Sequence, residues 1–292
     1  MGKGLLDPKV DFVFKNIFGS PNHPEILISF LNATLKAKKK IVNVDIKKTD
    51  IEKQYIEDKY SRLDVKATTS NDEIINIEIQ LKNENNMVKR SLYYLSKMYE
   101  EQLNEKEDYS KLVRTVCINI LNFKYLKTDN FHTGYRFKEI ESNEELTDIM
   151  EVHFIEIPKL QDSSDEKDML VAWTEFLKDP ESEKVRGLEL SIEEIRQAKD
   201  ELIRMSNDST QRELYDMRAN SLRDKMSELN AAERKGIEKG REEGREEGRK
   251  EGIEEGRKEE KIEIARNMKL SGLDTNTIAK ITNLSEDEID KL

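Results

Sequence analysis

Three polar residues, Asp64, Glu78 and Gln80, have the types and spacing of a small metal site. They belong to segments 62–67 and 74–81, in which apolar and polar residues alternate as they do in half-buried strands. Successive side chains of a strand point to opposite faces. All three residues therefore fall on the side of a predicted hairpin that lies away from its apolar residues.

A three-residue loop at 70–72 would set the register of this hairpin. Paired positions then sum to 142, so Asp64 faces Glu78 with Cβ atoms about 5 Å apart. Two carboxylates that close repel each other unless a cation lies between them. Such oxygen ligands suit a hard ion like Mg²⁺. The alternative is that these acids are only solvated surface, although an Asp facing a Glu is an unfavourable cross-strand pair.

The charge of the chain is unevenly distributed. Its net charge is −11, but residues 1–126 carry 21 Lys and Arg against 18 Asp and Glu. The acidic balance of the whole chain therefore does not exclude a nucleic-acid partner for its first half. A phosphate backbone requires basic groups, and the candidates for DNA contacts follow the second hairpin strand: Lys82, Lys89, Arg90 and Lys97.

Cysteine usage and hydropathy favour a cytoplasmic protein without a membrane span. The single cysteine, Cys117, excludes an internal disulfide, and its apolar neighbours predict a buried thiol. Apolar runs are shorter than the ~20 residues that cross a bilayer, and the first residues do not resemble a signal peptide. His23, His132 and His153 are isolated and are expected on the surface or in loops, so they indicate no rival site.

The remaining pattern predicts a mixed sheet with helices on both faces. The apolar run at 114–121 is typical of an interior parallel strand. It follows a helical pattern at 88–103, which can form a crossover from the hairpin. The other predicted elements are helices at 7–18, 24–35 and 166–178 and strands at 41–46 and 152–157.

The resulting order, αβββαβ, and several short motifs resemble the PD-(D/E)XK nuclease superfamily. More closely, the chain is similar to its bacterial recombination-promoting nuclease (Rpn) and putative-transposase family. The resemblance implies an α/β, restriction-endonuclease-like core and covers roughly residues 5–180. The matching residues lie at 11–19, 30–32, 58–59, 63–65, 77–80 and 90–94.

The resemblance also implies roles for individual residues. Asp64 and Glu78 would hold Mg²⁺, or Mn²⁺, with the backbone carbonyl of Ile79. Asp11 would be an added acid from the first helix, as would Asp7, although Asp11 is equally placed to pair with Lys15.

The third signature residue of these nucleases is usually Lys, and here it is Gln80. An amide can orient a water molecule but carries no charge. Lys66 projects from the same hairpin face as Asp64 and could supply the missing cation.

We therefore expect a Mg-dependent DNA endonuclease associated with recombination or mobile elements. One alternative is a weak or inactive DNA-binding or interaction protein that retains the fold, which the Gln80 departure supports. Another is a scaffold whose tail assembles other subunits.

The C-terminal third predicts an all-helical tail. Glycines recur at every fourth position from Gly236 to Gly256, between Arg, Lys and Glu. Glycine weakens an isolated helix by about 1 kcal/mol per residue, so this segment is either a frayed linker or a helix that forms a homodimer or higher oligomer through its bare stripe. The predicted domains are the nuclease-like domain at 1–180, a helical linker at 181–233, the glycine-repeat helix at 234–261 and a helical unit at 262–292.

The last unit has the offsets of a helix-turn-helix, with Ala279, Asn283 and Ile289 at the small, turn and core positions. Its second helix is acidic, and phosphates would repel it. A capping or protein-contact role is therefore preferred to DNA reading.

Overall fold

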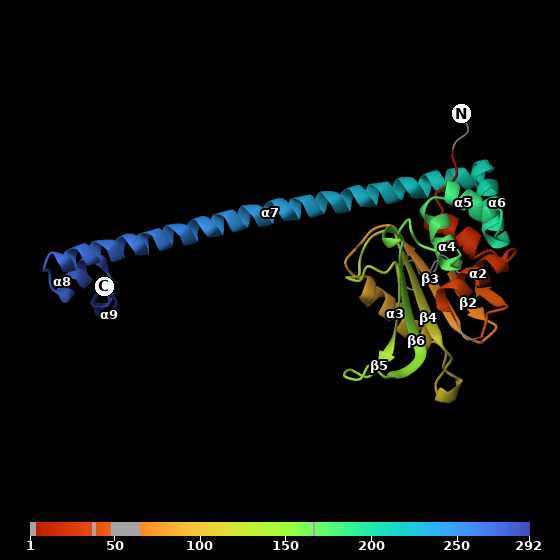
Figure 1. Cartoon of the computed structure of the whole chain (residues 1–292), viewed down its shortest axis with the longest axis horizontal. Helices are drawn as coiled ribbons and strands as arrows, with labels where there is room; N and C mark the ends of the chain where they lie inside the picture. Colours follow the sequence, from red (N-terminus) through yellow and green to blue (C-terminus); the bar gives the residue numbers. More distant parts are fainter. Residues whose placement is uncertain (1–3, 37–38, 48–64, 166) are drawn as a thin grey trace. The chain divides into compact units, whose positions relative to one another are not determined.

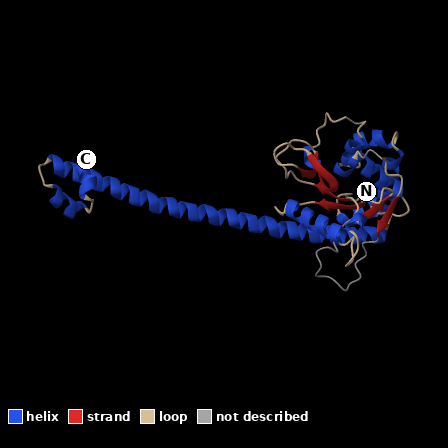
Figure 2. Ribbon diagram, turned by 90° about the horizontal axis from the view of Figure 1, so that it is seen from below, coloured by secondary structure: helices blue, strands red, loops and turns tan. Residues whose placement is uncertain are grey.

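A computed structural model describes residues 4–36, 39–47, 65–165 and 167–292. They form two compact units, residues 1–223 and 224–292. Every described strand lies in the first unit, and the described elements of the second are all helical (Figure 2). No helix within the described ranges is both long and apolar enough to cross a bilayer.

The first unit is built on a six-stranded sheet of order β1-β2-β3-β4-β6-β5. The strands are β1 (Val44–Lys47), β2 (Val65–Thr69), β3 (Ile74–Gln80), β4 (Thr115–Leu121), β5 (His132–Lys138) and β6 (Glu145–Glu156). Strand β4 is buried along its whole length, because it runs parallel to both β3 and β6 with helices on either side. This confirms the predicted α/β class and the interior parallel strand.

Helices cover both faces of the sheet (Figure 1). On one face lie α1 (Asp11–Phe18), α2 (Pro24–Leu35) and α4 (Met169–Lys178), whose aromatic side chains pack around Trp173. On the other face lies α3 (Met87–Glu100), the crossover between β3 and β4. The remaining helices of this unit are α5 (Glu183–Glu189), α6 (Glu193–Asn207), the start of α7 (Ser209–Leu270), and the 3-10 turns η3 (Tyr109–Lys111) and η4 (Ile157–Lys159).

The predicted hairpin register is confirmed for the described residues. Val65 pairs with Ile77 and Ala67 with Ile75, so each pair sums to 142. The Thr69 amide donates to the Glu73 carbonyl across the predicted three-residue loop.

The predicted starts of α1 and β1 were wrong. Helix α1 begins at Asp11 because the Asp7 carboxylate accepts the Lys9 amide and forms a turn there. Strand β1 begins at Val44 because the side chain of Asn32 holds both backbone groups of Ile41, which therefore does not join the ladder.

The edge hairpin of β5 and β6 was not fully predicted. Strand β5 was missed, and β6 begins at Glu145 rather than at 152. Most of β5 is exposed, so it lacks the apolar alternation on which the prediction depended.

The second unit contains the rest of α7, then α8 (Thr275–Thr282) and α9 (Glu286–Asp290). Helix α7 is continuous through the glycine repeat, so the frayed-linker interpretation was wrong. Its end packs against α8 and α9 around Ala265, Ile278 and Ile289. Asn283 adopts the left-handed conformation in the turn after α8, with φ of 57°, as residues at helix C-termini commonly do.

Candidate active site

The candidate site lies where β3 passes beneath α3. Glu78 and Gln80 project from β3 toward this helix, and Glu78 is fully buried, with 1% of its side chain exposed. The interpretation of Glu78 as solvated surface was therefore wrong. Asp64, its predicted partner, lies outside the described residues, so its placement opposite Glu78 stays a prediction.

Arg90 of α3 connects two predicted site residues of β3. Its Nε lies 3.3 Å from Glu78 Oε2. With the Gln80 amide oxygen facing the guanidinium, Arg90 Nη2 and Nη1 donate to it at 3.0 and 3.2 Å. The guanidinium also lies over the ring of Tyr94, 5.4 Å from its centroid. The sequence analysis predicted that Arg90 contacts DNA, whereas in the structure its side chain points toward Glu78 and Gln80.

A network of small polar groups fixes α3 above the sheet. Ser91 Oγ lies 2.7 Å from the Met87 carbonyl and 2.9 Å from Asn119 Oδ1. Asn119 Nδ2 in turn donates to the His153 carbonyl at 3.1 Å. Ser91 and Asn119 are fully buried, and Asn119 is the β4 neighbour of Glu78. Asn119 was missed from the sequence, although a polar residue in an otherwise apolar strand was an available signal.

Two further groups sit on this face of the sheet. Asn76 is fully buried, and among the described residues its Oδ1 accepts no hydrogen bond. Cys117, its β4 neighbour, is buried as predicted. Burial, followed by the nearby Glu78 carboxylate, raises the pKa of the Cys117 thiol to about 12, so it is inert near neutral pH.

The other predicted site residues are spread more widely. Lys66 Nζ lies 3.7 Å from Glu101 Oε2 beyond the end of α3. Asp11 lies on α1, which covers the opposite face of the sheet. Its Oδ2 is 3.1 Å from Arg218 Nη1. Lys89 is exposed on α3, and Lys97 pairs with Glu100 and Glu101. Lys82 follows the end of β3 and is half-buried.

Within the described ranges, no three His, Cys, Asp or Glu side chains form a set that could hold a metal ion. A metal at Glu78 would therefore depend on Asp64 together with neutral oxygen donors.

A buried charge network lies on the opposite face of the sheet. Arg114, which is half-buried, forms ion pairs with the buried carboxylates of Glu73 and Glu151. His153 Nε2 lies 2.8 Å from Glu151 Oε1, and its Nδ1 lies 2.9 Å from Nε2 of the stacked His132. The prediction that His132 and His153 are surface or loop residues was wrong.

This network makes stability depend on pH. Burial, aided by the adjacent His153, lowers the pKa of His132 from 6.5 to about 4. The unfolded chain therefore binds the additional proton, and stability falls as the pH drops below 6.5. We expect a loss of about 2 kcal/mol between pH 7 and 5, measured by urea unfolding with Trp173 fluorescence.

The dependence of the free energy of unfolding on pH should flatten in His132→Asn. It should remain in His23→Asn, because His23 is half-exposed. Glu151 does not account for this window. Burial opposes its charge, but hydrogen bonds from His153 and Arg114 outweigh burial and lower its pKa to about 2. An unchanged slope in His132→Asn would contradict the assignment.

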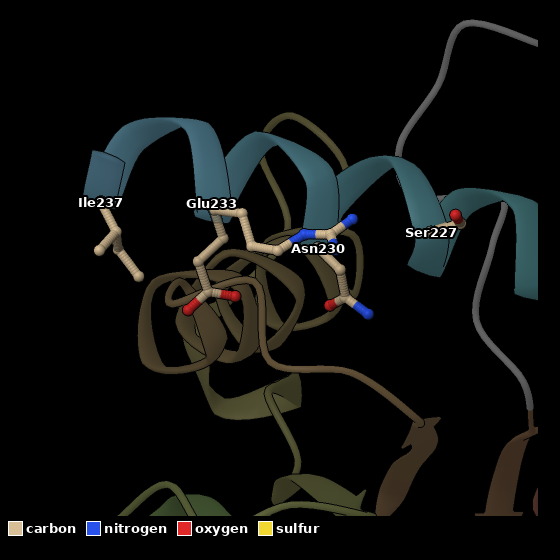
Figure 3. A pocket seen from close by; sticks show the side chains of 5 residues that line it. Ser227, Asn230, Glu233 and Ile237 are labelled. Carbon is tan, nitrogen blue, oxygen red and sulfur yellow. The ribbon is translucent and has the colours of Figure 1, made fainter. Parts of the chain in front are cut away.

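The glycine repeat and the hollows on α7 give no second site. Ser227, Asn230, Glu233 and Ile237 line a shallow hollow along this one helix (Figure 3). Apart from the nearby backbone of the helix itself, an added Cβ would meet no atom within 4 Å at any glycine from Gly236 to Gly256. The stripe is therefore open, as pairing through it requires.

Two known families match parts of the chain. A family profile described as "PD-(D/E)XK nuclease family transposase" matches residues 8–232. The chain belongs to this family. A second profile, described as "Rpn/YhgA-like nuclease family, C-terminal HTH domain", matches residues 258–292. No significant match was found among curated proteins or solved structures.

Both predicted relationships, to the PD-(D/E)XK nucleases and to the Rpn group, are confirmed. The helix-turn-helix seen in the offsets of the last unit is also confirmed. Its α9 carries Glu286, Asp287 and Glu288 in the first turn, so a protein contact for this helix stays our prediction.

Proposed function

We propose that this PD-(D/E)XK family member is a metal-dependent DNA endonuclease that acts in recombination or on mobile elements, in the bacterial cytoplasm. The observation that carries the proposal is the buried carboxylate of Glu78. A charged group is costly to bury unless a cation compensates it, so a position of this kind favours a functional role. Its neighbours on the same face, Gln80 and Asn76, offer neutral oxygens.

These donors fit a hard divalent ion. Carboxylate and amide oxygens are the ligands such ions prefer, and Asn76 Oδ1 accepts no hydrogen bond among the described residues. Asp64 and Glu78 would hold the ion with the Ile79 carbonyl, whereas Asp11, which pairs with Arg218 over the opposite face of the sheet, would not reach it. Bound Mg²⁺ or Mn²⁺ would acidify a water molecule and stabilise negative charge on the scissile phosphate.

The remaining residues would position the substrate. The Gln80 amide would orient a water by hydrogen bonding, and Lys66 would add positive charge on the same face. Lys82, Lys89 and Lys97 would contact the DNA backbone, which makes binding weaken steeply with salt. Two copies of the chain would pair through the open glycine stripe of α7, an arrangement that sedimentation of the full chain measures.

The direct test is nicking of supercoiled plasmid by the purified chain. We expect nicking with Mg²⁺ or Mn²⁺ and none when EDTA removes the ion. Nicking that persists in EDTA would exclude the proposed chemistry.

A second candidate function is DNA binding without cleavage. The observation that favours it is the neutral Gln80 whose oxygen faces Arg90. In that case plasmid would be bound but left intact at every metal concentration.

A further inference from the structure

The positive charge beside Glu78 comes from a side chain of the protein, that of Arg90. Arg90 Nε lies 3.3 Å from Glu78 Oε2, and the two Nη atoms face the oxygen of Gln80. The guanidinium therefore engages two of the side chains that the proposed nuclease would use around its ion. A sequence reading alone assigned Arg90 to the DNA backbone.

This pairing has a simple electrostatic reason. A carboxylate with 1% of its side chain exposed must be neutralised by a partner, because burying an unpaired charge is strongly unfavourable. Arg90 provides that partner without any bound ion. A divalent cation at Glu78 would provide it equally well, but two cations at one carboxylate repel each other.

The surroundings show which of the two groups can move. Helix α3 is anchored beside Arg90 by Ser91 and Met87, both of which are buried, and Ser91 reaches Asn119 of β4. The Arg90 side chain itself is 24% exposed. Its long, flexible stem can leave Glu78 while the helix stays in place; its guanidinium already lies over the ring of Tyr94, 5.4 Å from the centroid.

We propose that Arg90 is the built-in counter-ion of Glu78 and that a divalent metal must displace it to load the site. The inference rests on the proposed function, because it assigns the metal to Glu78. Arg90 is then a regulator of metal occupancy: it stabilises the metal-free protein and sets the metal concentration at which the site fills.

The experiment is calorimetric titration of the full chain with Mn²⁺ in the absence of DNA. Arg90→Gln should bind Mn²⁺ about tenfold or more tightly, because a close like charge has been removed. Its melting temperature without metal should fall, and Mn²⁺ should raise that temperature more than in the wild type. Arg90→Lys, which keeps the charge, should stay near the wild-type affinity.

A matched control is Arg196→Gln, which removes an arginine from an exposed Arg–Glu pair on α6 and should leave Mn²⁺ affinity unchanged. Circular dichroism confirms that each variant is folded. Equal or weaker Mn²⁺ binding by Arg90→Gln would overturn the counter-ion role.

The titration also separates this inference from the proposed function. If Mn²⁺ binding depends on Glu78 but not on Arg90, the metal site stands and only the counter-ion role fails. If neither the wild type nor Arg90→Gln binds Mn²⁺, both fail.

Discussion

Exchanging Glu78 for glutamine should slow Mg²⁺-dependent plasmid nicking by about a hundredfold or more, equivalent to about 2.7 kcal/mol of transition-state stabilisation. Glutamine keeps the shape of the side chain, but its neutral amide cannot balance a divalent ion. Asp64→Asn should produce a loss of similar size, because the proposed site needs both charges. The measurement is the initial rate of conversion of supercoiled to open-circular plasmid.

The control for this loss is Glu105→Gln, the same exchange at an exposed acid in the loop after α3. It should cleave like the wild type. Circular dichroism distinguishes loss of chemistry from loss of fold. Wild-type rates in both Glu78→Gln and Asp64→Asn would refute the metal assignment.

The second large effect concerns stability, in the network on the other face of the sheet. Arg114→Leu should reduce the free energy of unfolding by about 3–5 kcal/mol, because it removes a cation shared by two buried carboxylates. Glu73 has 9% and Glu151 4% of its side chain exposed, so water cannot replace the lost partner. Urea unfolding followed by Trp173 fluorescence measures the change.

The exposed pair of Glu193 and Arg196 is again the matched comparison. Arg196→Gln should leave the free energy of unfolding nearly unchanged, because surface ion pairs contribute little to stability. A similarly small change in Arg114→Leu would show that Arg136 and His153 satisfy Glu151 without it.

Local patterns predicted most of the fold correctly. The alternation at 74–81 and the short loop before it defined β3 and its register with β2, because side-chain period and loop length together leave one solution. The continuous apolar run of β4 identified an interior strand. Helix α2 was predicted with the observed ends, since Pro24 marks its first turn.

The partners within the site could not be read in the same way, because they depend on contacts between distant segments. Glu78 and Arg90 meet only after α3 folds back over β3. One signal was available for the direction of Arg90: it lies four residues before Tyr94, which is buried on the same side of the helix.

The buried histidine was also within reach of the sequence. His153 lies two residues before the buried Ile155 of β6, and residues two apart in a strand point to the same face. Its partner His132 could not be found, because it belongs to the missed strand β5.

Helix α3 both connects two core strands and covers Glu78. Ligand binding at Glu78 is therefore thermodynamically linked to the folding of the central sheet. A ligand that binds only the folded form adds to its stability in proportion to the logarithm of ligand concentration. Under the proposed function, the concentration of divalent ions in the cell would thus affect both the stability of the folded chain and its rate of DNA cleavage.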